Sequence, residues 1–147
     1  MTDTNDTITV ETRVPASPEA AWDAYTAPEA IMRWNQATPE WCCPHAEVDL
    51  REGGRHVARM EARDGSMGFD MAGTYEEVDA PRALTLRLDD GRRARTTFEA
   101  EGNGTRVRTV FNPEASNPAD MQRDGWQAIL DSYAAYVTET GTKGTTK

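Results

Sequence analysis

The sequence contains few cysteines, and their spacing excludes a disulfide scaffold. Of the 147 residues only Cys42 and Cys43 are cysteine, and they are adjacent. Neighbouring cysteines rarely close a disulfide, because the ring that they form is too small for good geometry. Two reduced thiols are instead typical of a cytosolic chain.

Basic charge is also scarce, which excludes partners that present an anionic surface. The chain has 16 Lys+Arg against 25 Asp+Glu, for a net charge of −9. Binding to nucleic acid or to an anionic membrane begins with a net basic surface, so we expect neither partner. No apolar run approaches the length of about 18 residues that a membrane span needs. The acidic N-terminus MTDTNDTITVE lacks the basic and apolar segments of a secretion signal, and we therefore expect a cytoplasmic protein.

The length is that of one ordinary domain, and it is sufficient to bury a core without metal ions or disulfides. Hydrophobic residues make up 37% of the chain, and no repeat, linker or low-complexity block divides it. We expect a single domain over residues 1–140. The last seven residues, GTKGTTK, predict a flexible tail over residues 141–147.

The first third of the chain predicts one strand and two short helices. Apolar residues alternate along Thr7–Val14, which is typical of a strand. Ser17-Pro18 supplies a good N-cap followed by a proline at the first helical position, which predicts a helix that ends at Thr26. A second helix is predicted over Pro28–Trp34. Residues 35–44, which contain both cysteines, predict a loop.

Beyond residue 44 the apolar period changes to two, which predicts six further strands. They are expected over His45–Leu50, Arg55–Arg63, Met67–Val78, Ala83–Leu88, Arg93–Ala100 and Thr105–Asn112. The turns Asp64-Gly65, Asp90-Gly91 and Gly102-Asn103-Gly104 contain residues that tolerate positive φ, as hairpin turns require. The pattern therefore predicts an antiparallel meander whose alternate side chains point to opposite faces.

The last predicted element is a long amphipathic helix. Asn117-Pro118 supplies a cap and a first-position proline, and Asp120 follows three residues after the cap. Apolar residues then recur at helical spacing to about Glu139, and Gly141 can end the helix. Because the helix and the sheet each have one apolar face, we expect them to pack together. One helix cannot cover the concave face of a bent seven-stranded sheet, so we also expect a cavity between them.

Four stretches of the chain carry a resemblance to a known family. They are ITVETRVPASPEAAWDAYTAPEAIMRWN, GSMGFDMAGTYEEV, RTTFEAEGNGTRV and MQRDGWQAILDSYAAYV. The chain resembles, over residues 7–139, the bacterial family named after the activator of heat-shock protein 90 ATPase, within the START-like (SRPBCC) superfamily. The resemblance implies an α+β helix-grip fold, in which a seven-stranded curved antiparallel sheet wraps around a long C-terminal helix and two short helices lie between strands 1 and 2. It also implies an internal pocket for a small hydrophobic molecule, and it brings no shared catalytic residue.

Two places in the sequence depart from the family pattern. Ala27 stands where a short polar helix cap is usual, which weakens the predicted start of the second helix. His56 and Ala58 stand where bulkier aromatic residues are common. If both face inward, the pocket is larger and more polar than in typical relatives, so no ligand is carried over from them.

The residues that invite a metal or cofactor interpretation do not support one. Cys42 and His45 have Cys-x-x-His spacing, but a closed structural zinc site needs four ligands and the chain has one further histidine, His56. We therefore predict no metal at this segment and interpret it as a turn with small buried thiols. The sequence has no GxGxxG motif, P-loop or HExxH motif, so no cofactor is predicted.

Three titratable positions have both a chemical and a structural interpretation. His56 is either a general acid or base or a hydrogen-bonded core residue, and the second is favoured because no carboxylate partner lies at a fixed spacing. Asp70 is interpreted as an exposed acid that pairs with an arginine such as Arg59. The run Arg92-Arg93-x-Arg95 is interpreted as the end of a hairpin neutralised by Asp89-Asp90 rather than as an anion site.

The predicted ligand site is the wall of the expected cavity, and its residues are mainly aromatic, sulfur-containing and aliphatic. They are Trp34, Trp41, His56, Met60, Met71, Phe98, Trp126, Ile129 and Tyr133. The main hypothesis is a binding protein that takes a small hydrophobic or amphipathic molecule into this cavity, without catalysis. One alternative is a cyclase or lyase in which His56 or a tyrosine moves a proton. Another is a chaperone-associated interaction module with an exposed apolar patch.

Overall fold

A computed structural model describes residues 7–36, 38–114 and 118–145 of the chain. Within these residues the elements follow one another as one strand, two short helices, six strands and a long helix. They are β1 (Ile8–Val14), α1 (Pro18–Thr26), α2 (Pro28–Trp34), β2 (Trp41–Val48), β3 (Arg55–Ala62), β4 (Gly68–Asp79), β5 (Ala83–Leu88), β6 (Arg93–Glu101), β7 (Gly104–Phe111) and α3 (Ala119–Thr145).

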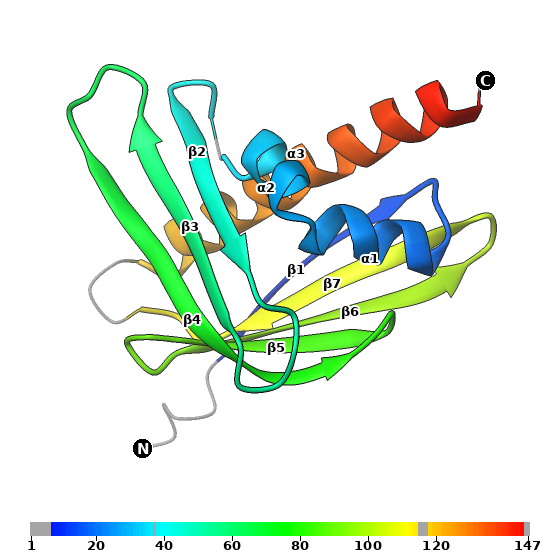
Figure 1. Ribbon diagram of the computed structural model, residues 1–147, viewed down its shortest axis with the longest axis horizontal. Helices are drawn as coiled ribbons and strands as arrows, with labels where there is room; N and C mark the ends of the chain where they lie inside the picture. The colour runs from blue at the N-terminus through cyan, green and yellow to red at the C-terminus, as the bar shows by residue number, and fades with distance from the viewer. Residues whose placement is uncertain (1–6, 37, 115–117, 146–147) are drawn as a thin grey trace.

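The seven strands form one antiparallel sheet in the order β1-β7-β6-β5-β4-β3-β2. Strands β2 to β7 are therefore a continuous meander, and β1 joins it at the β7 edge. The sheet curls, so that β2, β3 and β4 rise at a steep angle to the flatter half made by β5, β6, β7 and β1 (Figure 1). This arrangement confirms the predicted α+β helix-grip fold.

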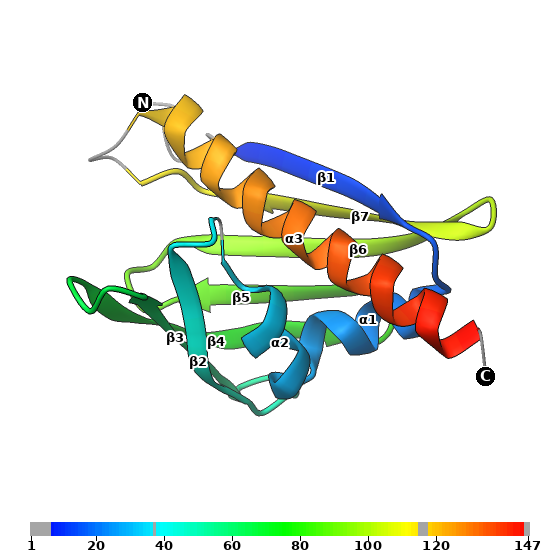
Figure 2. The same ribbon diagram turned by 90° about the horizontal axis from the view of Figure 1, so that it is seen from above.

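Helix α3 crosses the concave side of the sheet diagonally, above β1, β7 and β6, and the two short helices lie beside it (Figure 2). Its Gln127 holds the helix to the edge strand β1, because the side-chain amide accepts a hydrogen bond from Glu11 N at 3.3 Å and donates one to Glu11 O at 3.0 Å. Phe111 of β7 stacks on Trp126 of α3, with ring centroids 3.9 Å apart. These contacts fix the helix over the β1–β7 half of the sheet. Among the described residues, none of the helices is long and apolar enough to cross a bilayer.

One end of the space under α3 is filled by a cluster of aromatic rings from α1, α2, α3 and β6. Tyr25 lies at its centre, with ring centroids 5.2 Å from Tyr133, 5.3 Å from Trp34 and 5.5 Å from Phe98. The Tyr133 hydroxyl donates a hydrogen bond to Ala21 O at 2.7 Å. This cluster packs one end of the core.

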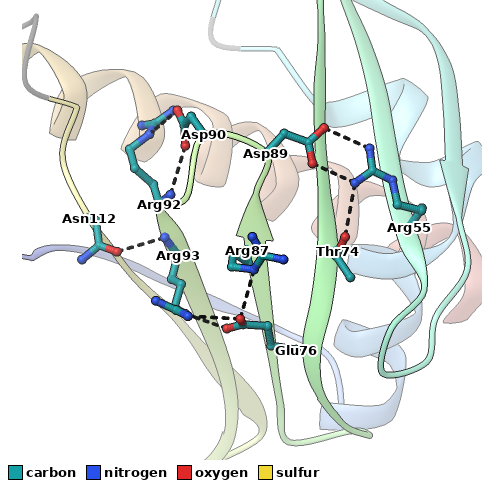
Figure 3. Close-up of polar contacts among 9 residues, drawn as sticks. All are labelled: Arg55, Thr74, Glu76, Arg87, Asp89, Asp90, Arg92, Arg93 and Asn112. Carbon is teal, nitrogen blue, oxygen red and sulfur yellow. Dashed lines mark hydrogen bonds and ion pairs between the residues drawn. The ribbon is translucent and has the colours of Figure 1, made fainter.

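The outer face of the sheet carries charged side chains that pair across strands (Figure 3). Arg55 contacts Asp89 at 2.7 Å, and Glu76 lies between Arg93 at 2.6 Å and Arg87 at 3.2 Å. The hydrogen bond from Arg93 is the largest cause of the lowered pKa of Glu76, and that from Arg55 acts likewise on Asp89. The charged side chains on the outer face of the sheet thus largely neutralise one another.

Two of the predicted strand and helix boundaries differ from the structure by more than two residues. Residues 41–44 are not a loop, because β2 begins at Trp41 and pairs with β3 from there. Helix α3 does not end before Gly141 but continues to Thr145. Glycine costs a helix about 1 kcal/mol and ends it mainly by adopting positive φ. In the described residues the glycines with positive φ are those at 53, 65, 91 and 102, the last three in predicted hairpin turns.

Two predictions about the C-terminal part of the chain are not tested by the structure. The predicted cap Asn117 lies outside the described residues. The flexibility of residues 141–147 stays a prediction, although the backbone of 141–145 is helical.

Candidate functional site: the cavity between helix α3 and the sheet

A cavity of about 430 Å³ lies under the N-terminal half of α3, next to the aromatic cluster. Its walls come from β1, β3, β4, β5, β6 and β7 and from all three helices. The surface is mainly apolar; aliphatic contributors include Ile31, Leu84, Leu86, Leu88, Ala94 and Leu130. Helix α3 contributes residues at helical spacing, from Gln122 through Gly125, Trp126 and Ile129 to Leu130. The volume is within the range of drug-sized binding sites, about 300–1,000 Å³.

Six of the nine residues predicted for the cavity wall line it, and three do not. Those that line it are Trp34, His56, Met60, Met71, Trp126 and Ile129. Phe98 and Tyr133 belong to the aromatic cluster, where each is at most 2% exposed. Trp41 is at the start of β2, where its ring lies 6.0 Å from that of Phe69. The difference arises because packed core and cavity wall use the same residue types.

Several lining residues are not among those predicted from the sequence. The leucines of β5 show a sequence signal, since Leu84, Leu86 and Leu88 alternate with polar residues on a predicted strand. Tyr25 and Tyr75 have no comparable signal, because an aromatic residue on an apolar face is equally consistent with solid core. Their position is known only from the three-dimensional structure.

The most polar feature of the inner wall is a pair formed by His56 and Tyr75. The register of β3 and β4 places His56 opposite Gly73, and Tyr75 occupies the next inward position on β4. No side chain from Gly73 separates them, and the His56 Nδ1 and Tyr75 hydroxyl oxygen are 2.9 Å apart. Burial lowers the pKa of His56 to about 4 and raises the pKa of Tyr75. Both side chains are therefore uncharged at neutral pH.

A second polar group on the cavity wall consists of hydroxyls. The Thr96 hydroxyl lies 2.8 Å from that of Thr109 and 3.3 Å from that of Tyr25. Burial also raises the pKa of Tyr25. This group is uncharged and its hydroxyls can satisfy one another.

Among the described lining residues, charge is limited to Arg92 and Glu114. The side chain of Arg92 is 25% exposed, and its Nε contacts Asp90 at 2.8 Å (Figure 3). Glu114 is joined through its backbone to Gln122 of α3 by hydrogen bonds of 2.6 and 2.8 Å. The charges are of opposite sign and both side chains are partly exposed, so the inner wall itself is neutral.

The other candidates for chemistry are not among the residues that line the cavity. Cys43 is buried, which raises the pKa of its thiol, whereas His45 is exposed and contacts Glu47 at 2.6 Å. Asp70 is exposed and lies 3.5 Å from Arg59. In the part of the chain that the structure describes, no three His, Cys, Asp or Glu side chains gather as a metal site would require.

The arginine run after the β5–β6 turn is neutralised mainly from another strand. Arg92 pairs with Asp90 inside the turn, as expected. Arg93 and Arg95 pair instead with carboxylates of β4, Glu76 and Glu77. The charges of Arg93 and Arg95 are therefore neutralised by β4 and not by the carboxylates of the turn.

The comparisons with known proteins agree with this architecture. The model of the Activator of Hsp90 ATPase homolog 1-like protein family matches residues 15–138. The solution structure of the AHSA1-like protein from Aeromonas hydrophila is 40% identical, with a TM-score of 0.87 over 92% of this chain and 94% of that one. The solution structure of Chr148 from Cytophaga hutchinsonii is 42% identical, with a TM-score of 0.78 over the same shares. The crystal structure of CalU16 from Micromonospora echinospora, 20% identical with a TM-score of 0.67 over 93% of this chain and 79% of that one, shares the fold. The comparison with curated proteins gives no match.

Proposed function

The chain belongs to the Activator of Hsp90 ATPase homolog 1-like family, and from this premise we propose that it binds a small hydrophobic or amphipathic molecule in the cavity between α3 and the sheet. The observation that carries the proposal is the cavity itself, which is apolar over most of its wall and bears a few fixed polar groups. Binding sites for small molecules have this composition, since apolar walls supply affinity and polar groups supply orientation. Transfer of ligand carbon surface from water contributes about 25 cal/mol per Å².

The geometry favours binding over acid–base catalysis at the same place. In the described part of the chain the hydrogen-bond partner of His56 is Tyr75, and no carboxylate orients the ring or increases its basicity. A pKa of about 4 makes His56 a weak base at neutral pH, far from the value near 7 that suits a general base. The hypothesis of a chaperone partner stays a prediction.

Titration with 1-N-phenylnaphthylamine, an uncharged probe whose fluorescence increases in apolar surroundings, tests the proposal. We expect saturable binding with one site per chain. Met71 lines the cavity from β4, so Met71→Trp should fill part of it and weaken binding more than tenfold.

The matched control is Asp70→Trp, which introduces the same side chain one residue earlier on the outer face, where Asp70 is exposed. We expect this variant to bind the probe as the unmodified chain does. Absence of saturable binding, or equal loss of binding in both variants, would contradict the proposal.

A further inference from the structure

The His56–Tyr75 pair leaves one hydrogen-bonding position directed into the cavity. In the described residues every fully buried side-chain nitrogen or oxygen has a partner. His56 has one partner, Tyr75, through Nδ1. Its Nε2 is therefore not fully buried, and His56 is one of the residues that line the cavity.

The pair offers a donor to the cavity in either arrangement of its hydrogens. If the Tyr75 hydroxyl donates to Nδ1, the neutral ring carries its hydrogen on Nε2. If Nδ1 donates to the tyrosine oxygen, the hydroxyl hydrogen of Tyr75 is left without an acceptor, and Nε2 is an acceptor. A carbonyl oxygen satisfies the first arrangement and a hydroxyl group satisfies either.

A charged group at this place meets a wall whose basic residue is already paired. The inner wall described above is neutral; of the charged lining residues, Arg92 is paired with Asp90 at 2.8 Å and Glu114 lies in the segment after β7. A carboxylate or an ammonium group buried beside His56 loses its hydration without an ion pair in return. The wall therefore favours an uncharged polar group.

We propose that the ligand of this cavity is an uncharged, largely apolar molecule whose carbonyl or hydroxyl oxygen hydrogen-bonds to the His56–Tyr75 pair. This inference rests on the proposed function, and it adds the chemical class of the ligand and the residues that select it. The cavity volume of about 430 Å³ restricts the ligand to the smaller end of drug-sized molecules.

Competition against 1-N-phenylnaphthylamine with three matched naphthalenes tests this ligand class. They are 2-acetylnaphthalene, its hydrocarbon analogue 2-isopropenylnaphthalene, and 2-naphthoate, which is a carboxylate at pH 7.5. We expect 2-naphthoate to bind at least tenfold more weakly than the ketone. The ratio of the dissociation constants of ketone and hydrocarbon is the measure of the hydrogen bond.

The double variant His56→Phe/Tyr75→Phe removes the polar pair and replaces both partners with apolar rings, which leaves neither partner unsatisfied. We expect the affinity for the ketone to fall about 3- to 10-fold relative to the affinity for the hydrocarbon in this variant, as for the loss of one neutral hydrogen bond. The control Tyr133→Phe removes a buried tyrosine hydroxyl outside the cavity wall and should leave the ratio unchanged.

The outcomes separate this inference from the proposed function. Failure of the reporter probe to bind the unmodified chain contradicts the proposed function. If the probe binds but the double variant keeps the ratio, or if 2-naphthoate binds most tightly, the ligand class is wrong. If the preference for the ketone over the hydrocarbon is lost only in Thr96→Val/Thr109→Val, the Thr96 and Thr109 hydroxyls recognise the ligand instead. That result would also overturn the inference.

Discussion

His56 occupies a strand position at which the folded chain holds its imidazole uncharged. Burial is the cause, because it penalises the charged ring and lowers the pKa of His56 from 6.5 to about 4. Between these two pH values the unfolded chain binds a proton at His56 that the folded chain does not bind. The free energy of unfolding must therefore fall as the pH is lowered through this window.

We expect the free energy of unfolding to fall by about 2 kcal/mol between pH 7 and pH 5 because of His56. The paired carboxylates Glu76 and Asp89 also have lowered pKa values, but their contribution is lost only as the pH falls below their ordinary values of 4.5 and 3.8. Urea unfolding at several pH values above 5 therefore measures the contribution of His56 separately from that of these carboxylates. The variant His56→Phe/Tyr75→Phe should show a much smaller loss, and an equal loss in both proteins would assign the titration to another group.

At the scale of elements, the junction of α1 and α2 depends on a single residue. Ala27 ends α1, with its N–H donating to Asp23 O at 3.0 Å, and it also stands at the N-cap of α2. Its side chain cannot cap, whereas Ser17 at the start of α1 accepts a hydrogen bond from Ala20 N at 3.2 Å. The Trp34 indole donates to Ala24 O at 2.9 Å and links the two helices.

Substitutions at these two N-cap positions should change the free energy of unfolding in opposite directions. Ser17→Ala removes a formed cap and should lower the free energy of unfolding by about 1 kcal/mol. Ala27→Ser supplies the hydroxyl that α2 lacks, and should raise it by about 0.5–1 kcal/mol, because Ala27 already has the extended backbone of an N-cap. Urea unfolding measures both. A gain of the same size in Ala27→Val, which cannot accept a hydrogen bond, would rule out capping as the cause.

The same elements show how far the sequence determines the fold. The bounds of α1 and α2 are predicted correctly, because Ser17, Pro18 and Pro28 act locally on the backbone. The start of β2 is not, because residues 35–44 show no alternation of apolar residues and Pro44 is a residue that strands rarely contain away from edges and irregularities. Strand β2 is at the edge of the sheet, and its pairing with β3 shifts between Cys42 and His45, so the proline sits at an irregularity where no ladder hydrogen bond is lost.

At the scale of the whole molecule, the space under α3 is divided between packed core and cavity, and this division is not encoded in residue type. Tyr133 and Trp126 are both aromatic residues on the inner side of α3, yet Tyr133 is sealed in the aromatic cluster and Trp126 lines the cavity. The position along the helix relative to α1 and α2 decides the outcome. Sequence patterns therefore predict that a wall residue faces inward, and only the arrangement of the elements determines whether another side chain covers it.

Gly125 of α3 offers the sharpest whole-molecule test, because it faces the cavity at a helical position. A Cβ atom added there meets no atom within 4 Å. Gly125→Ala should raise the free energy of unfolding by about 1 kcal/mol through helix propensity and leave probe binding nearly unchanged. Gly125→Leu should raise it further, since a leucine that becomes buried contributes about 1.5–3 kcal/mol, and should weaken binding of 1-N-phenylnaphthylamine more than tenfold. Urea unfolding and probe titration on the same samples measure both effects.

A leucine variant that is less stable than the alanine variant would mean that the wall cannot accommodate the side chain. A leucine variant that is more stable but binds the probe unchanged would mean that the probe binds elsewhere. A gain in stability together with a loss of affinity at one position is expected only if the added side chain and the ligand use the same space.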